Sequence, residues 1–317
     1  MGVLQLLQQM RAEGTLSATQ LEVLSAIHLK KRFSLHQELR GLIYAGVLLV
    51  ILGTGLTIKT YLAELGHIAI ISSLSVCTTA ALAYCFYRGQ PYSRSEVPSP
   101  NIGFDYILLL GCSLYSLDIA YIETQFHLLG DSWDSYLLIS AALFFFLAYR
   151  FDNRLVLSFA LGTLAAWFGF KLNLILVNFW DYHRLYAMTY GLMTLFAGTA
   201  LQHLNIKRHF LDVYLNFALN FLFIALVSGV IDHGFLSLYF AGLVVLDAAV
   251  ILYALAERKF LYFLYAILYG YVAISYLIID TLESLSSPFW IFTYFIVSSM
   301  AVVWLILKTS RHLKGTP

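Results

Sequence analysis

The sequence predicts an all-α membrane protein, a polytopic bundle of about ten transmembrane helices preceded by a short helical hairpin. Three observations predict this class. The chain of 317 residues is 60% hydrophobic and 12% charged, whereas a soluble domain has roughly 25% charged residues. Its apolar residues form runs whose lengths are close to the roughly 20 residues that a helix needs to cross a bilayer. Its basic residues gather in every second gap between those runs.

Residues 1–36 predict a cytoplasmic amphipathic helical hairpin. Gly14 is typical of a helix end, and Ser17 with Gln20 forms a capping-box pattern that starts a second helix. A hairpin of this size has no core of its own, so we expect it to pack on the membrane domain, lie at the lipid surface or dock a membrane protein partner. It lacks the three-helix core of DNA-binding domains, and the net charge is only +1, so no nucleic acid partner is predicted.

Residues 37–310 predict the transmembrane bundle, and residues 311–317 predict a cytoplasmic tail. The loop at 88–101 is the longest and is rich in Ser, Pro and Gly, so we expect it to be the most mobile. The predicted spans are 40–60, 66–87, 104–126, 134–150, 154–171, 183–203, 209–231, 234–256, 259–280 and 287–308.

The side on which each basic residue falls predicts the orientation. One side receives only Lys59, Lys171 and Arg184, and the opposite side receives all other lysines and arginines. Basic residues favour the cytoplasmic face, so both termini are predicted in the cytoplasm. The chain has no Asn-x-Ser/Thr sequon, which fits a bacterial inner membrane. Three basic turns, at 149–154, 205–209 and 256–259, recur at intervals of about 50 residues. They indicate either a tandem hairpin repeat or only the basic residues that every cytoplasmic turn needs.

Two stretches of the chain carry a family resemblance. The first runs Gly-Thr-Leu-Ser-Ala-Thr-Gln at 14–20 and leads into Arg-Gly-Leu-Ile at 40–43. The second is Tyr-Arg-Phe-Asp-Asn-Arg at 149–154, followed by Ala-Ala-Trp-Phe-Gly at 165–169. Together they resemble the bacterial multi-pass membrane proteins grouped as "domain of unknown function 2157", most closely over the first half of the chain. The resemblance implies a many-helix inner-membrane protein with no established activity, and it transfers no catalytic residue.

Asp247 lies in the middle of the apolar run at 243–250. A charge at the bilayer centre costs about 2.5–3.5 kcal/mol on insertion scales, so the residue requires an explanation. Asn220 lies at nearly the same distance from the turn at His233, and Asn216 lies one helical turn from Asn220. We expect these three residues to form one mid-membrane polar cluster. It is either a proton or substrate site, or a set of interhelical hydrogen bonds.

A second group of charges is predicted near the outer face. Asp118 and Glu123 belong to the third span, Lys59 ends the first and Lys171 ends the fifth. They are placed to pair around an outward-facing cavity, although Lys59, Glu123 and Lys171 also lie where charged side chains ordinarily reach the interface. Asp118 is deeper and joins Asp247 as a second intramembrane carboxylate.

Tyrosines at 262, 265, 269 and 276 mark one face of the ninth span. Such a stripe lines a ligand groove or, more commonly, packs against a neighbouring helix with each hydroxyl group bonded.

Two classes of function fit the sequence. The first is a carrier-like protein that handles a small molecule or lipid through an intramembrane carboxylate site. The second is a non-catalytic scaffold, sensor or subunit of a larger membrane complex. The P-loop, the GxSxG elbow and the HExxH motif are absent, so an enzyme is not favoured, and no metal or cofactor is predicted.

Overall fold

The structure is a computed structural model that describes residues 45–54, 56, 66–128, 130, 134–175, 179–283 and 288–313. The predicted hairpin at 1–36 lies outside these residues, and of the first predicted span only the helix Ala45–Thr54 and residue 56 are described. The chain divides into two compact units, Met1–Ile70 and Ile71–Thr316. Within the described residues all regular structure is helical, which confirms the all-α part of the predicted fold class.

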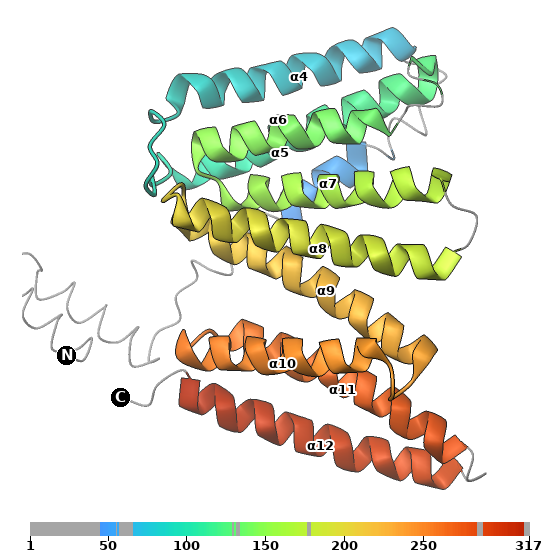
Figure 1. The fold of residues 1–317 in the computed structure, drawn as a ribbon. Helices are drawn as coiled ribbons and strands as arrows, with labels where there is room; N and C mark the ends of the chain where they lie inside the picture. Colours follow the sequence, from blue (N-terminus) through green and yellow to red (C-terminus); the bar gives the residue numbers. More distant parts are fainter. Residues whose placement is uncertain are drawn as a thin grey trace, which may run out of the picture. The chain divides into compact units, whose positions relative to one another are not determined.

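From residue 67 onward, nine α-helices follow one another in the described chain, and each begins and ends within about five residues of a predicted span (Figure 1). A single 3₁₀ turn, η2 (Arg208–Phe210), precedes α9. The helices are α4 (His67–Arg88), α5 (Ile102–Phe126), α6 (Ser135–Phe151), α7 (Arg154–Ile175), α8 (Phe179–His203), α9 (Leu211–His233), α10 (Leu238–Ala256), α11 (Phe260–Glu283) and α12 (Pro288–Leu313).

Six segments in the described part are long and apolar enough to cross a membrane: α4, α5, α9 together with η2, α10, α11 and α12. The apolar stretches of α6 and α7, Ser135–Phe151 and Arg154–Gly169, are shorter than the length this criterion requires. α8 begins with the polar residues Asp181, His183 and Arg184, which lower its hydropathy. A membrane protein with several spans is therefore established, and the count of ten stays a prediction.

Three turns share one backbone geometry. The left-handed residues Asp152, Asn205 and Arg258 stand 53 residues apart along the chain, with φ of 57°, 56° and 53°. After each one, a backbone N–H donates over 3.0 Å to the carbonyl five residues earlier, from Asn153 to Ala148, Ile206 to Leu201 and Lys259 to Ala254. This is the Schellman arrangement that ends a helix. The interval of about 50 residues seen in the sequence is therefore present as a repeated helix stop.

The turns join three hairpins, α6–α7, α8–α9 and α10–α11, and these pairs make the most extensive helix–helix contacts in the described chain. Two buried clusters result. One gathers residues of α4 to α7 around Phe104, Phe144 and Leu157, and the other gathers residues of α9 to α11 around Phe223 and Tyr262. α9 contributes to both, because Tyr214 faces the first cluster and Leu215 the second.

Candidate functional site

Asp118 is buried between α4 and α5, with 7% of its surface exposed. The hydroxyl group of Ser75 on α4 donates a hydrogen bond of 2.6 Å to Asp118 Oδ2. Asp118 Oδ1 is also buried and has no hydrogen-bond partner, as is true of the Thr78 hydroxyl one turn along α4 from Ser75. A buried polar atom without a partner is costly, so this carboxyl group is incompletely satisfied.

Asp247 occupies the middle of α10 and lies against α11. A Cβ atom placed on Gly270 would stand only 2.9 Å from Asp247 Oδ2, so the absence of a side chain at Gly270 makes room for the carboxyl group. Asp247 Oδ1 is buried and, like Asp118 Oδ1, has no hydrogen-bond partner. Asp118 and Asp247 thus each have a buried carboxyl oxygen without a donor.

Of the expected cluster of Asn216, Asn220 and Asp247, only the two asparagines are joined by a hydrogen bond in the described residues, and Asp247 is bonded to neither. Tyr265 donates to Asn216 Oδ1 over 3.2 Å, and Tyr269 donates to Asn220 Oδ1 over 2.8 Å. The Asn220 amide donates to the carbonyl of Asn216 over 2.7 Å. α11 contacts both α9 and α10, and its tyrosines supply the donors to both asparagines.

A third contact in the α9–α11 seam, the set of contacts between tyrosines of α11 and polar residues of α9, lies near the turn that precedes α11. Tyr262 donates to Asp212 Oδ1 over 3.1 Å, and Lys259 forms an ion pair with the same carboxylate. Burial lowers the pKa of Lys259, but the hydrogen bond and charge of Asp212 outweigh it and raise this pKa above its ordinary value. Three of the four tyrosines in the predicted stripe therefore hold α11 against α9.

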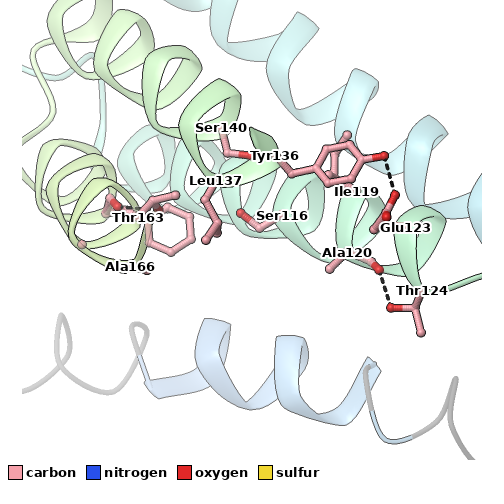
Figure 2. Close-up of a pocket in the computed structure, with 12 residues that line it drawn as sticks. Ser116, Ile119, Ala120, Glu123, Thr124, Tyr136, Leu137, Ser140, Thr163 and Ala166 are labelled. Atoms are coloured by element: carbon pink, nitrogen blue, oxygen red, sulfur yellow. Dashed lines mark hydrogen bonds between the residues drawn. The ribbon is translucent and has the colours of Figure 1, made fainter. Parts of the chain in front are cut away.

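A cavity of about 550 Å³ lies between α5, α6 and α7 (Figure 2). Glu123 lines it and accepts a hydrogen bond of 2.8 Å from the Tyr136 hydroxyl group. Asp118 is not among the described residues that line this cavity, and it accepts a hydrogen bond from Ser75 instead. The pairing of these charges around an outward-facing cavity stays a prediction. Lys59 and the side chain of Lys171 lie outside the described residues.

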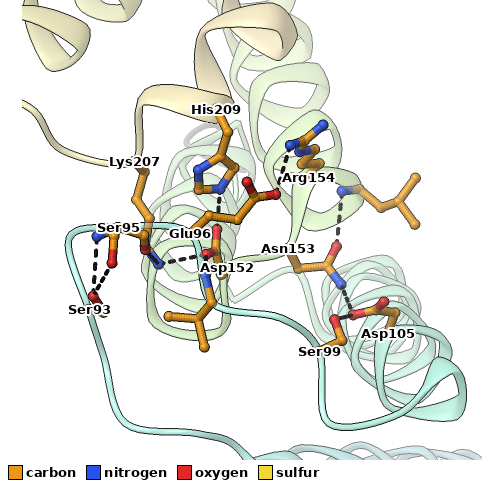
Figure 3. Close-up of polar contacts among 12 residues, drawn as sticks. Ser93, Ser95, Glu96, Ser99, Asp105, Asp152, Asn153, Arg154, Lys207 and His209 are labelled. Carbon is orange, nitrogen blue, oxygen red and sulfur yellow. Dashed lines mark hydrogen bonds and ion pairs between the residues drawn. The ribbon is translucent and has the colours of Figure 1, made fainter. Parts of the chain in front are cut away.

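The sequence analysis missed a buried ionic network between the α4–α5 loop and two turns (Figure 3). The side chains of Asp152 and Lys207 are each 1% exposed and form an ion pair of 2.8 Å between Asp152 Oδ2 and Lys207 Nζ. His209 contacts the other oxygen of Asp152, and the backbone N–H of Val97 donates to Oδ2. Every oxygen of this carboxylate therefore has a partner.

The same network fixes the loop at 88–101 that composition predicts to be mobile. Lys207 donates from its backbone N–H to the Arg94 carbonyl over 2.9 Å and from Nζ to the Ser95 carbonyl over 3.0 Å. Arg154 pairs with Glu96 at 3.0 Å. The only sequence signal for this site is an acidic residue, Asp152, inside an otherwise basic turn.

A second unexpected pair lies at the opposite helix ends. Arg184 Nη2 is 2.8 Å from Asp232 Oδ2, and the guanidinium carbon lies 5.4 Å from the centre of the Tyr239 ring. Arg184 is 4% exposed, so it is held among α8, α9 and α10 instead of extending into solvent. Across the residues that the structure describes, no three His, Cys, Asp or Glu side chains gather as a metal ion would require.

Apolar helices joined by short turns, with carboxyl groups buried among them, define a polytopic helical membrane protein. Residues 8–157 match the family described as "Predicted membrane protein (DUF2157)", which confirms the resemblance seen in the sequence. Residues 158–317 lie beyond the matched segment. No curated protein and no solved structure gives a significant match to this chain.

Proposed function

We propose that the protein is a membrane carrier in which Asp118 and Asp247 bind and release protons as a small molecule or lipid moves. The observation that carries this proposal is the pair of buried carboxyl oxygens, Asp118 Oδ1 and Asp247 Oδ1, that have no donor. A charged carboxylate at mid-membrane is disfavoured by about 2.5–3.5 kcal/mol, and uptake of a proton removes that cost. A carboxyl group in this state is suited to changing its protonation as its surroundings change.

The proposal includes an orientation in a bacterial inner membrane. The ends of α4, α6, α8 and α10 and the starts of α5, α7, α9 and α11 carry most of the basic residues of the described chain. The positive-inside rule assigns that end, with both chain termini, to the cytoplasm. The cavity at Glu123 then opens toward the outer face, because Glu123 and Tyr136 lie near the opposite ends of α5 and α6.

The test is proton movement in proteoliposomes that hold a pH-sensitive dye. We expect the parent protein to dissipate an imposed pH gradient, and Asp118→Asn and Asp247→Asn to reduce this rate to that of empty vesicles. Glu257→Gln removes a carboxylate from an exposed turn and is the matched control. Parent protein that moves no protons, or Asn variants that move them unchanged, would contradict the carrier and favour the alternative of a non-catalytic scaffold, sensor or subunit.

A further inference from the structure

The cavity between α5, α6 and α7 offers hydrogen-bond acceptors and few donors. Three of its five hydroxyl groups donate to carbonyls of their own helix: Ser116 to Cys112 over 3.2 Å, Thr124 to Ala120 over 2.7 Å and Thr163 to Phe159 over 2.8 Å. The Tyr136 hydroxyl donates to Glu123. A hydroxyl group has one hydrogen and two lone pairs, and each of these four groups already donates its hydrogen within the protein. Toward a ligand they can therefore only accept hydrogen bonds.

The charge of the cavity lining also favours a ligand that donates hydrogen bonds. Glu123 is the only carboxylate or basic side chain among the twelve described residues that line the cavity, and Figure 2 shows it beside Tyr136 at one end. A carboxylate next to acceptor oxygens favours a cation that brings its own N–H donors. The remaining wall is apolar and includes Ile119, Leu137 and Phe159.

Size and position complete the description. A volume of about 550 Å³ lies within the range of small-molecule sites, which bind largely through apolar walls and a few polar groups. Glu123 lies one turn before the end of α5, where an ammonium group remains close to the membrane–water interface. We infer that this cavity binds a free amphipathic amine, with the ammonium group at Glu123 and an apolar body toward Phe159. The inference rests on the proposed carrier function and gives the chemical class of its solute.

The experiment measures saturable binding of radiolabelled 4-phenylbutylamine to the full-length protein in phosphatidylcholine–phosphatidylglycerol nanodiscs, with empty nanodiscs subtracted. The matched alcohol, 4-phenylbutan-1-ol, and the matched acid, 4-phenylbutyrate, keep the apolar body and change only the head group. We expect the amine to bind and both analogues to compete about ten-fold or more weakly, because each loses the charged donor. Equal competition by the alcohol would overturn the inference.

Two variants test the location. Glu123→Gln removes the charge and Ala166→Phe fills the cavity, so each should weaken amine binding about ten-fold or more. Glu257→Gln and Ala142→Phe are the controls, since Glu257 lies in an exposed turn and Ala142 is exposed on α6 outside the cavity lining. Unchanged binding in both test variants, with size-exclusion profiles like that of the parent, would contradict the site.

The outcomes also separate this inference from the carrier. Asp118→Asn and Asp247→Asn should retain amine binding, because neither residue lines the cavity. Amine binding without proton movement would contradict the carrier alone, and proton movement without amine binding would contradict the amine site alone. If nanodiscs that contain phosphatidylethanolamine abolish probe binding, a lipid head group occupies the cavity and the assignment to a free amine is wrong.

Discussion

Carboxyl groups are buried both in the turns at the basic helix ends and in the middles of the helices, but they differ in their hydrogen-bond partners. The side chain of Asp152 is 1% exposed and has partners on both oxygens, from a lysine, a histidine and a backbone N–H. Asp118 is 7% exposed and has a single donor, Ser75. A fully bonded buried charge fixes local structure, whereas a partly bonded one lowers stability and is a candidate for function. The contrast separates the residues that hold the loops from those that are candidates for proton binding.

The largest expected effect comes from breaking the fully bonded pair. Lys207→Met leaves Asp152 as a buried carboxylate without its main counter-charge, and loss of one partner of such a pair costs about 3–5 kcal/mol. We expect this loss in the free energy of unfolding, measured by SDS titration in mixed micelles. Arg208→Met, at an exposed neighbouring position, should change it little. A loss of under about 1 kcal/mol for Lys207→Met would show that the network does not hold the loops.

The next effect tests the contact of Asp247 with α11. Gly270→Ala places a methyl group about 2.9 Å from Asp247 Oδ2, so the carboxyl group must move and the free energy of unfolding should fall by about 1 kcal/mol relative to the same change at Gly169. Asp247→Ala in the same chain should restore most of that loss, because it removes the obstructing atoms. Gly169→Ala is the control, since nothing lies within 4 Å of its added Cβ. Equal losses in the single and double variants would argue that Asp247 does not lie over Gly270.

Asp118→Asn sharpens the comparison with Asp152. The amide oxygen still accepts from Ser75 and the buried charge is gone, so the free energy of unfolding should stay within about 1 kcal/mol of the parent value. Asp152→Asn, in contrast, leaves Lys207 buried without a carboxylate and should lose several times more. The two are compared in one SDS titration series. Similar losses would remove the distinction between the two regions.

The smallest effect concerns the seam between α9 and α11. Tyr269→Phe removes the hydrogen bond to Asn220 and should cost about 0.6 kcal/mol, the average for such bonds between membrane helices. Tyr276→Phe serves as the control, because Tyr276 is 39% exposed on the same helix. The thermal midpoint of each variant in detergent provides the measurement. A midpoint for Tyr269→Phe identical to that of Tyr276→Phe would show that the hydrogen bond from Tyr269 to Asn220 does not stabilise the protein.

The helices themselves were predictable, because apolar length and basic turns are both encoded locally. The equal depth of Asp247 and Asn220, inferred from counting along an antiparallel pair, stays a prediction. The hydrogen bonds of Asn216 and Asn220 were not predictable in this way, because that count considers two helices and a third, α11, supplies Tyr265 and Tyr269. The contacts of the loop at 88–101 were not predictable either, since its partners Asp152 and Lys207 are distant in sequence.

The repeated helix stops at Asp152, Asn205 and Arg258 have a consequence for biosynthesis. Each stop closes a hairpin whose two helices contact one another more extensively than most other pairs. Contacts between segments that are close in the chain form early, because little of the chain must be ordered to make them. The first helix of each hairpin can therefore contact its main partner as soon as the second helix leaves the ribosome. We therefore expect assembly in the bilayer to proceed pair by pair, with α9 joining the earlier pairs to the later one.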